Sequence, residues 1–174
     1  MKKTILLPLT LLLLIFTSKT TAQNMSEAGS FGAGLAWTSL NYGASLKYNF
    51  TKSHTGQIIV GSVNYGFSYA DQSSFSITGR YSYNLDTNDI GFASFHPYLY
   101  GQVGYWTLKY DLGYLGSYNL NSIAAGIGGG TEWSFNDFIQ GLAFSIELGY
   151  TYVSFDGVAS IGGFNGGGGI HYYF

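Results

Sequence analysis

Cysteine is absent from this 174-residue chain, which excludes disulfides, thiolate metal sites and a lipid-modified N-terminal Cys. Proline occurs only twice. Charged residues make up 9% of the chain, whereas they make up about a quarter of ordinary soluble domains. Only seven residues are Lys or Arg, and three of these fall within the first nineteen, so no basic surface for nucleic acid is predicted.

Long apolar runs are also missing, apart from Ile5 to Phe16, which Pro8 and Thr10 interrupt. This run is shorter than the roughly 20 residues that a transmembrane helix needs. Lysines at positions 2 and 3 precede it, and small residues at 20 and 22 follow it. The pattern predicts a cleaved secretory signal over residues 1–22 and one domain over 23–174, with a retained anchor as the alternative. The predicted domain holds four basic and nine acidic residues, a net charge of −5.

Glycine, tyrosine and phenylalanine are abundant, with 26, 16 and 13 residues. The last stretch, Gly162 to Phe174, shows how they are arranged. Every second residue back from Phe174 is aromatic, Ile or Gly, while the alternate set includes His171 and Asn165. Such a period of two predicts a half-buried β-strand.

The same alternation predicts seven further strands. Their ranges are about 29–38, 42–50, 58–69, 75–85, 97–108, 122–133 and 142–153. Pro97 is expected to mark the start of the fifth strand, because proline is tolerated there. The polar residues Asp86 to Asp89 predict a turn, and Asp111 to Tyr118 the longest loop. Eight strands of about ten residues suit an antiparallel up-and-down barrel, and no segment has a helical period.

The two faces of the strands differ in composition, and the fifth strand is the least clear. In the third strand we expect Ile59, Val63, Tyr65, Phe67 and Tyr69 to point outward, opposite Ser62, Asn64, Gly66 and Ser68. The fifth strand is apolar on both faces. Leu99, Val103 and Tyr105 are assigned outward there because this places Gln102 inward.

The end of the chain resembles the C-terminal assembly signal of Gram-negative outer-membrane barrels. Gly169, Tyr172 and Phe174 match that signal, although position 167 is Gly where a polar residue is usual. The whole predicted domain is similar to the small eight-stranded barrels of the OmpA/OmpX type. The resemblance implies an outer-membrane location, contact with the lipid bilayer, help from the barrel-assembly machinery, periplasmic termini and a monomer.

Barrel size decides which face points inward. Eight strands enclose just enough space for side chains, so the bulky aromatic set must lie outside and the small and polar set inside. The charges Lys47, Arg80, Glu132 and Glu147 all fall on the small face. Because an unpaired charge in a narrow interior is costly, we predict a lumen ion-pair network with Arg80–Glu147 as its best-matched pair.

Aromatic residues near the strand ends predict girdles at both membrane interfaces. The outer girdle would contain Trp37, Tyr69 and Tyr152, and the inner girdle Tyr48, Trp133, Tyr172 and Phe174.

No residue pattern predicts an enzyme, a metal or another cofactor. His54, His96 and His171 lie on different strands or turns, without clustered carboxylates. The glycine clusters lack the spacing of a phosphate-binding loop, and Asp86, Asn88 and Asp89 lack the Gly and terminal Glu of a calcium loop.

Three functions are compatible with these observations. The leading hypothesis is a membrane scaffold or surface-interaction protein with a largely plugged lumen. A narrow porin-like channel for ions or small solutes is the alternative, since many interior glycines would leave space. A soluble lipocalin-like binder would need bulky residues inside, which the barrel size disfavours.

Overall fold

The computed structural model describes residues 27–63, 72–89, 93–111, 116–135, 138–156 and 160–174. The predicted signal at 1–22 therefore lies outside the described residues. The described residues form nine strands: β1 (Phe31–Thr38), β2 (Asn41–Asn49), β3 (His54–Val63), β4 (Gln72–Asn84), β5 (Asn88–Asp89), β6 (Ser94–Asp111), β7 (Ser117–Ser134), β8 (Leu142–Phe155) and β9 (Ser160–Tyr173).

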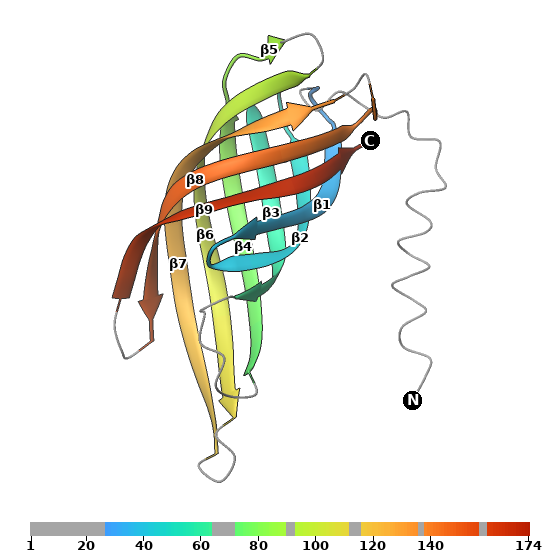
Figure 1. Ribbon diagram of the computed structural model, residues 1–174. Coiled ribbons are helices and arrows are strands. Elements are labelled where there is room, and N and C mark those ends of the chain that lie inside the picture. Colours follow the sequence, from blue (N-terminus) through green and yellow to red (C-terminus); the bar gives the residue numbers. More distant parts are fainter. Residues whose placement is uncertain (1–26, 64–71, 90–92, 112–115, 136–137, 157–159) are drawn as a thin grey trace, which may run out of the picture.

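Eight of these strands close into an antiparallel barrel, as the sequence predicted (Figure 1). Neighbours in sequence are neighbours in the sheet, β1 pairs with β9, and β4 pairs with β6. The two-residue β5 lies in the predicted polar turn and pairs only with the start of β6. We call the end that holds Phe31 and Tyr173 the base; it is the upper end in Figure 1, and the opposite end is the far end.

Alternation along the strands separates an apolar outer surface from a polar interior. The outward side chains include Leu35, Tyr42, Leu46, Ile77, Tyr81, Ile127, Leu148 and Phe164, all exposed. The buried inward side chains include Ser45, Lys47, Gln57, Thr78, Arg80, Glu132, Glu147, Thr151 and Asn165. A soluble barrel would show the reverse arrangement, so the packing of this chain suits a barrel surrounded by lipid.

The third strand corrects one prediction, because its faces are reversed between His54 and Val63. Ile59 and Val63, predicted to point outward, are buried, whereas Ile58 and Val60 are exposed. The hairpin register explains this, since Lys47 lies directly opposite Gln57 and opposed residues share a face. Three consecutive β-branched residues carry no alternation of their own. The predicted outward Tyr65, Phe67 and Tyr69 lie outside the described residues.

The predicted facing of the fifth strand, β6, is confirmed. Leu99, Val103 and Tyr105 are exposed, and Gln102 bonds inside the barrel. The strand begins at Ser94, three residues before the predicted start at Pro97. Pro97 fits within it because the regular pairing with β4 ends opposite Tyr98, and on that side the Pro97 carbonyl accepts a hydrogen bond from Leu85 N at 2.8 Å.

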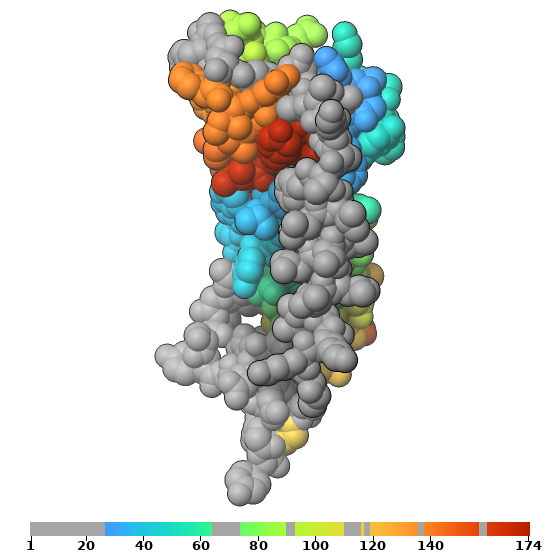
Figure 2. Space-filling view, turned by 90° about the vertical axis from the view of Figure 1, so that its right-hand side faces the viewer, coloured from blue at the N-terminus to red at the C-terminus, as the bar shows by residue number. Residues whose placement is uncertain are grey.

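The wall of the barrel is uneven in height. Strands β1 and β2 have 8 and 9 residues, whereas β6 and β7 have 18 each. The atoms of β1 and β2, blue to cyan in Figure 2, end near the middle of the molecule. The long strands therefore extend well past the β1–β2 hairpin toward the far end (Figure 1).

Candidate functional site

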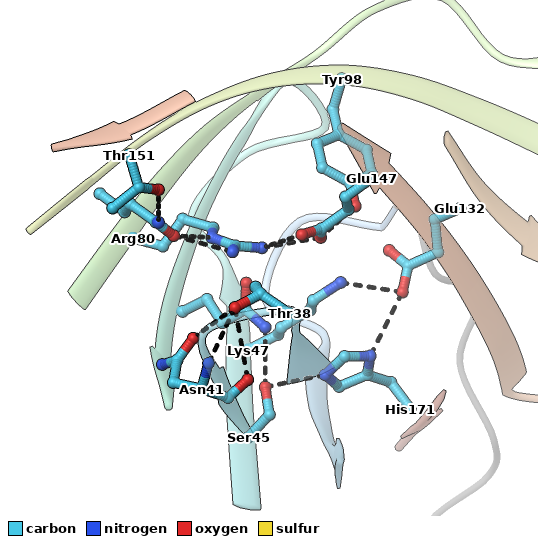
Figure 3. A network of polar contacts seen from close by, with 12 residues as sticks. Thr38, Asn41, Ser45, Lys47, Arg80, Tyr98, Glu132, Glu147, Thr151 and His171 are labelled. Atoms are coloured by element: carbon cyan, nitrogen blue, oxygen red, sulfur yellow. Dashed lines mark hydrogen bonds and ion pairs between the residues drawn. The ribbon is translucent and has the colours of Figure 1, made fainter. Parts of the chain in front are cut away.

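Two ion pairs cross the interior of the barrel, and the pair nearer the base joins Lys47 to Glu132. The Lys47 Nζ lies 2.9 Å from Glu132 Oε1, and both side chains are buried. The Tyr173 hydroxyl donates to Glu132 Oε2 at 3.0 Å. His171 lies beside them, with Nδ1 3.6 Å from Glu132 Oε1 and Nε2 2.8 Å from the Ser45 hydroxyl (Figure 3). One carboxylate thus links side chains from β2, β7 and β9.

The second pair lies farther from the base and joins Arg80 to Glu147. Arg80 Nη1 lies 2.7 Å from both carboxylate oxygens of Glu147 (Figure 3). Its Nη2 donates to Gln102 Oε1 at 2.8 Å, and the Tyr98 hydroxyl donates to Glu147 Oε1 at 2.5 Å. Tyr100 covers the guanidinium, whose carbon is 4.1 Å from the ring centroid, a cation–π distance. Every donor and acceptor named here therefore has a partner within the barrel.

All four charges predicted from the sequence are brought together, in the two pairs Lys47–Glu132 and Arg80–Glu147. The neutral members of the network were not predicted: Gln102, Tyr98, Tyr100 and Tyr173. The inward phase of Gln102 was a usable signal, since residues two and four positions earlier on a strand share its face.

Tyrosine rings occupy the space that interior glycines leave. A methyl group on Gly128 would lie 2.5 Å from the Tyr100 ring and hydroxyl, and one on Gly149 would lie 2.5 Å from the same hydroxyl. One on Gly130 would lie 2.9 Å from the Tyr98 hydroxyl. Large rings from β6 fill the space beside these glycines. The glycines therefore do not indicate an open channel through the barrel.

The interior becomes apolar toward the far end. Trp106, only 1% exposed, packs in a cluster with Val63, Ala124 and Val153, and the partly buried Leu40 and Phe155 lie against it. The Trp106 indole donates to the Thr78 hydroxyl at 3.2 Å, so its polar atom is satisfied. This cluster was not predicted, because the interior was expected to hold small and polar residues throughout.

The seam between the first and last strands involves the terminal aromatic. Phe174 and Phe31 exchange backbone hydrogen bonds, Phe174 N to Phe31 O at 2.9 Å and Phe31 N to Phe174 O at 3.3 Å. Their rings lie 5.3 Å apart. Of the other residues in the predicted assembly signal, Tyr172 points outward and Gly169 inward.

The residues predicted to form girdles lie at different heights. Trp37 is exposed at the tip of the β1–β2 hairpin, and Tyr152 is exposed on the outer face of β8. Trp133 lies near the base, half-buried and stacked on Phe95 at 5.5 Å. Tyr69 lies outside the described residues.

No described helix has the length and hydrophobicity needed to cross a membrane. Within the described ranges, no three His, Cys, Asp or Glu side chains gather where they could hold a metal ion.

Comparisons with known proteins identify the fold. No family model matches the chain, and no curated protein matches it significantly. Among solved structures, the N-terminal β-barrel domain of Pseudomonas aeruginosa OprF matches with a TM-score of 0.60 and 14% identity, over 84% of this chain and 98% of that domain. Neisserial surface protein A (NspA) matches with a TM-score of 0.58 and 18% identity, over 83% of this chain and 95% of that chain. The fold is that of the small eight-stranded outer-membrane β-barrels.

Proposed function

We propose that this chain is an outer-membrane protein whose filled barrel conducts no solute and serves as a membrane scaffold or a surface-interaction protein. The apolar outer surface and closed sheet support insertion into lipid, which offers no partner to an open backbone. The even number of barrel strands places both ends of the barrel chain at the base, which we assign to the periplasm. The aromatics Trp37 and Tyr152 would then lie at the outer interface and Trp133 at the inner one.

Biogenesis and assembly state follow from the same assignment. The barrel-assembly machinery would recognise the last strand through Gly169, Tyr172 and Phe174. We propose a monomer, because the eight barrel strands close on each other without needing a second copy.

The filling of the interior is the observation that carries the non-conducting role. Buried ion pairs cross it at two levels, and the Trp106 cluster packs inside it toward the far end, which supports a closed lumen. The channel alternative relied on space beside interior glycines, and Tyr98 and Tyr100 occupy that space. A solute would have to displace several side chains whose polar atoms are already paired.

Single-channel recording tests this proposal. The chain from residue 23 onward is refolded into a planar bilayer, and a heat-dependent gel shift confirms folding. Folded, inserted and silent protein supports the proposal. A steady conductance that rises in Arg80→Ala, but not in the surface control Lys52→Ala, would establish a narrow pore and overturn it.

A further inference from the structure

Two apolar depressions mark the outer surface of the barrel. The first, of about 1010 Å³, crosses the wall from Ser39 at the β1–β2 turn to Leu99 on β6. The second, of about 710 Å³, lies beside it around Gly101 on β6 and shares Ile127 and Tyr150 with the first. They therefore form one continuous hollow, which we call the outer groove.

Outward-facing glycines create the outer groove. The register forms one row across β6, β7, β8 and β9 that consists of Leu99, Gly129, Leu148 and Gly166. Leucine side chains therefore alternate with glycines along this row. On the neighbouring row, a methyl group on Gly101 would meet no atom within 4 Å. Larger residues would fit there without disturbing the fold, so packing within the chain does not require this glycine.

The outer groove has the polarity and the direction of a site for an acyl chain. Most of its outward side chains are apolar, and Arg80, which borders it, sends its side chain inward to Glu147. Barrel strands tilt by about 35–45° from the axis, so a row that runs straight across them descends obliquely. This row leads from Ser39, near the far end of the short hairpin, toward Tyr83 and His54 at the base. In the proposed orientation it leads from the outer surface into the hydrocarbon.

A second pocket, partly polar and called here the polar pocket, lies on the same strands nearer the far end. It measures about 430 Å³ and is bordered by the polar side chains of Tyr105, Asn121, Ser154 and Asp156 and by the apolar Ile123 and Phe155. Asn121 sits four residues from Ala125 of the outer groove, on the same face of β7. Polar side chains thus join apolar ones on the outward surface of β7 and β8, beyond the groove toward the far end.

The side chains of this pocket suit a sugar ring. Tyr105 offers an aromatic face, and Asp156 offers a carboxylate acceptor. Thr107 donates to Asn121 Oδ1 at 3.2 Å, which leaves the amide nitrogen of Asn121 as a donor for a ligand. A ring with hydroxyl groups and apolar C–H faces uses all three chemistries, whereas a phosphate would gain nothing from Asp156.

We propose that this face binds one glycolipid of the outer leaflet, with its sugar between Tyr105, Asn121 and Asp156 and an acyl chain in the outer groove. This inference rests on the proposed outer-membrane location. A lipid without a sugar would leave the polar pocket unused. A second copy of the barrel would bring another convex wall of outward side chains, which fits the hollow poorly.

Native mass spectrometry of the refolded chain in detergent tests the proposal, with a neutral glucosyl diacylglycerol as the probe. Phosphatidylethanolamine with the same acyl chains is the comparison lipid. We expect one glucosyl lipid per barrel and weaker retention of phosphatidylethanolamine. Gly101→Leu, which fills the groove, and Asn121→Ala, which removes the sugar donor, should each weaken binding about tenfold, equal to about 1.4 kcal/mol. Ala44→Leu places the same side chain on the outward face of β2, opposite β7, and should change nothing.

Several results would overturn the glycolipid site. The first is equal retention of the glucosyl lipid and phosphatidylethanolamine by the parent protein. The second is glucosyl-lipid binding by Gly101→Leu as strong as that of the parent protein. The third is a dimer of the barrel without bound lipid. Flotation with liposomes separates this failure from that of the proposed function. Protein that inserts and shifts on heating but retains no glycolipid refutes only the site. Protein that folds yet does not insert refutes the membrane location, and the site with it.

Discussion

Arg80 and Glu147 are 67 positions apart in the chain, yet one guanidinium nitrogen of Arg80 lies 2.7 Å from both carboxylate oxygens of Glu147. The two residues come from β4 and β8, which are not neighbours in the sheet. Their pairing therefore bridges the interior and does not follow from any strand-to-strand register. It fixes the distance between two walls of the barrel.

Removing one partner of this pair should destabilise the barrel strongly. Among the described residues, Arg80→Ala leaves the buried Glu147 with the Tyr98 hydroxyl as its hydrogen-bond partner, and breaking a buried pair typically costs about 3–5 kcal/mol. Urea unfolding from lipid vesicles, followed by the heat-dependent gel shift, measures this. The double variant Arg80→Leu with Glu147→Leu should recover much of the loss, because no charge is then stranded. A single variant as stable as the parent protein would show that the charge finds water inside the barrel.

Two glycines on opposite faces of the wall should respond differently to the same change. A methyl group on Gly128 would lie 2.5 Å from Tyr100 and 2.6 Å from the Leu148 carbonyl oxygen, so Gly128→Ala should cost about 1–3 kcal/mol through overpacking. Gly79→Ala points outward into open space and should be neutral or slightly stabilising. The urea midpoints of the two variants give the comparison. Equal midpoints would mean that Tyr100 does not fill the interior at Gly128.

Tryptophan fluorescence can distinguish the two faces, because the chain has three Trp residues and they differ in position. A variant that keeps only Trp37 should be strongly quenched in bilayers of brominated lipids, since Trp37 is 44% exposed on the outer surface. A variant that keeps only Trp106 should be quenched far less, because Trp106 is enclosed by the barrel wall. Phe replaces the other two indoles in each case. Stronger quenching of Trp106 than of Trp37 would mean that the faces are assigned the wrong way round.

Truncating the terminal aromatic should impair assembly in cells more than stability. Phe174→Ala removes a ring contact with Phe31 at the closing seam and part of the predicted assembly signal. The amount of heat-shifting protein in the outer-membrane fraction should fall, while refolding into detergent micelles should proceed nearly as before. Tyr48→Ala removes an exposed aromatic on β2 and serves as the control. Equal effects of the two changes in cells would argue against a special role for Phe174.

Alternation of side chains was enough to predict most strands and their faces, because successive residues of a membrane-barrel strand face the lipid and the barrel interior in turn. The prediction failed at Ile59 and Val63 for a physical reason. The run Ile58, Ile59, Val60 has no polar member, so its phase is set by the pairing of Lys47 with Gln57 across the hairpin. Such a register depends on where the turn falls, which a single strand does not encode.

The interior was predicted in part. Charged residues within strands could be assigned to the interior from the sequence, because lipid excludes them. The four residues predicted there form two ion pairs. Trp106 gives no such signal, since an indole suits the lipid interface as well as a packed interior. The inward orientation of Trp106 follows from Gln102, because the two residues share one face of β6 and Gln102 bonds to Arg80 inside the barrel. The apolar cluster at the far end thus depends on contacts between strands that are distant in the sequence.

The short strands of the β1–β2 hairpin have a consequence for the surrounding bilayer. Eight residues at about 3.4 Å each extend about 27 Å, which at a tilt of 45° spans only about 19 Å along the membrane normal. The apolar band of an outer-membrane barrel is about 25 Å tall, so this side is too short for its lipids while the β6–β7 side is not. Hydrophobic mismatch of this one-sided kind thins the adjacent leaflet or leans the whole barrel. The chain should therefore favour thin membranes and sit in them at an angle.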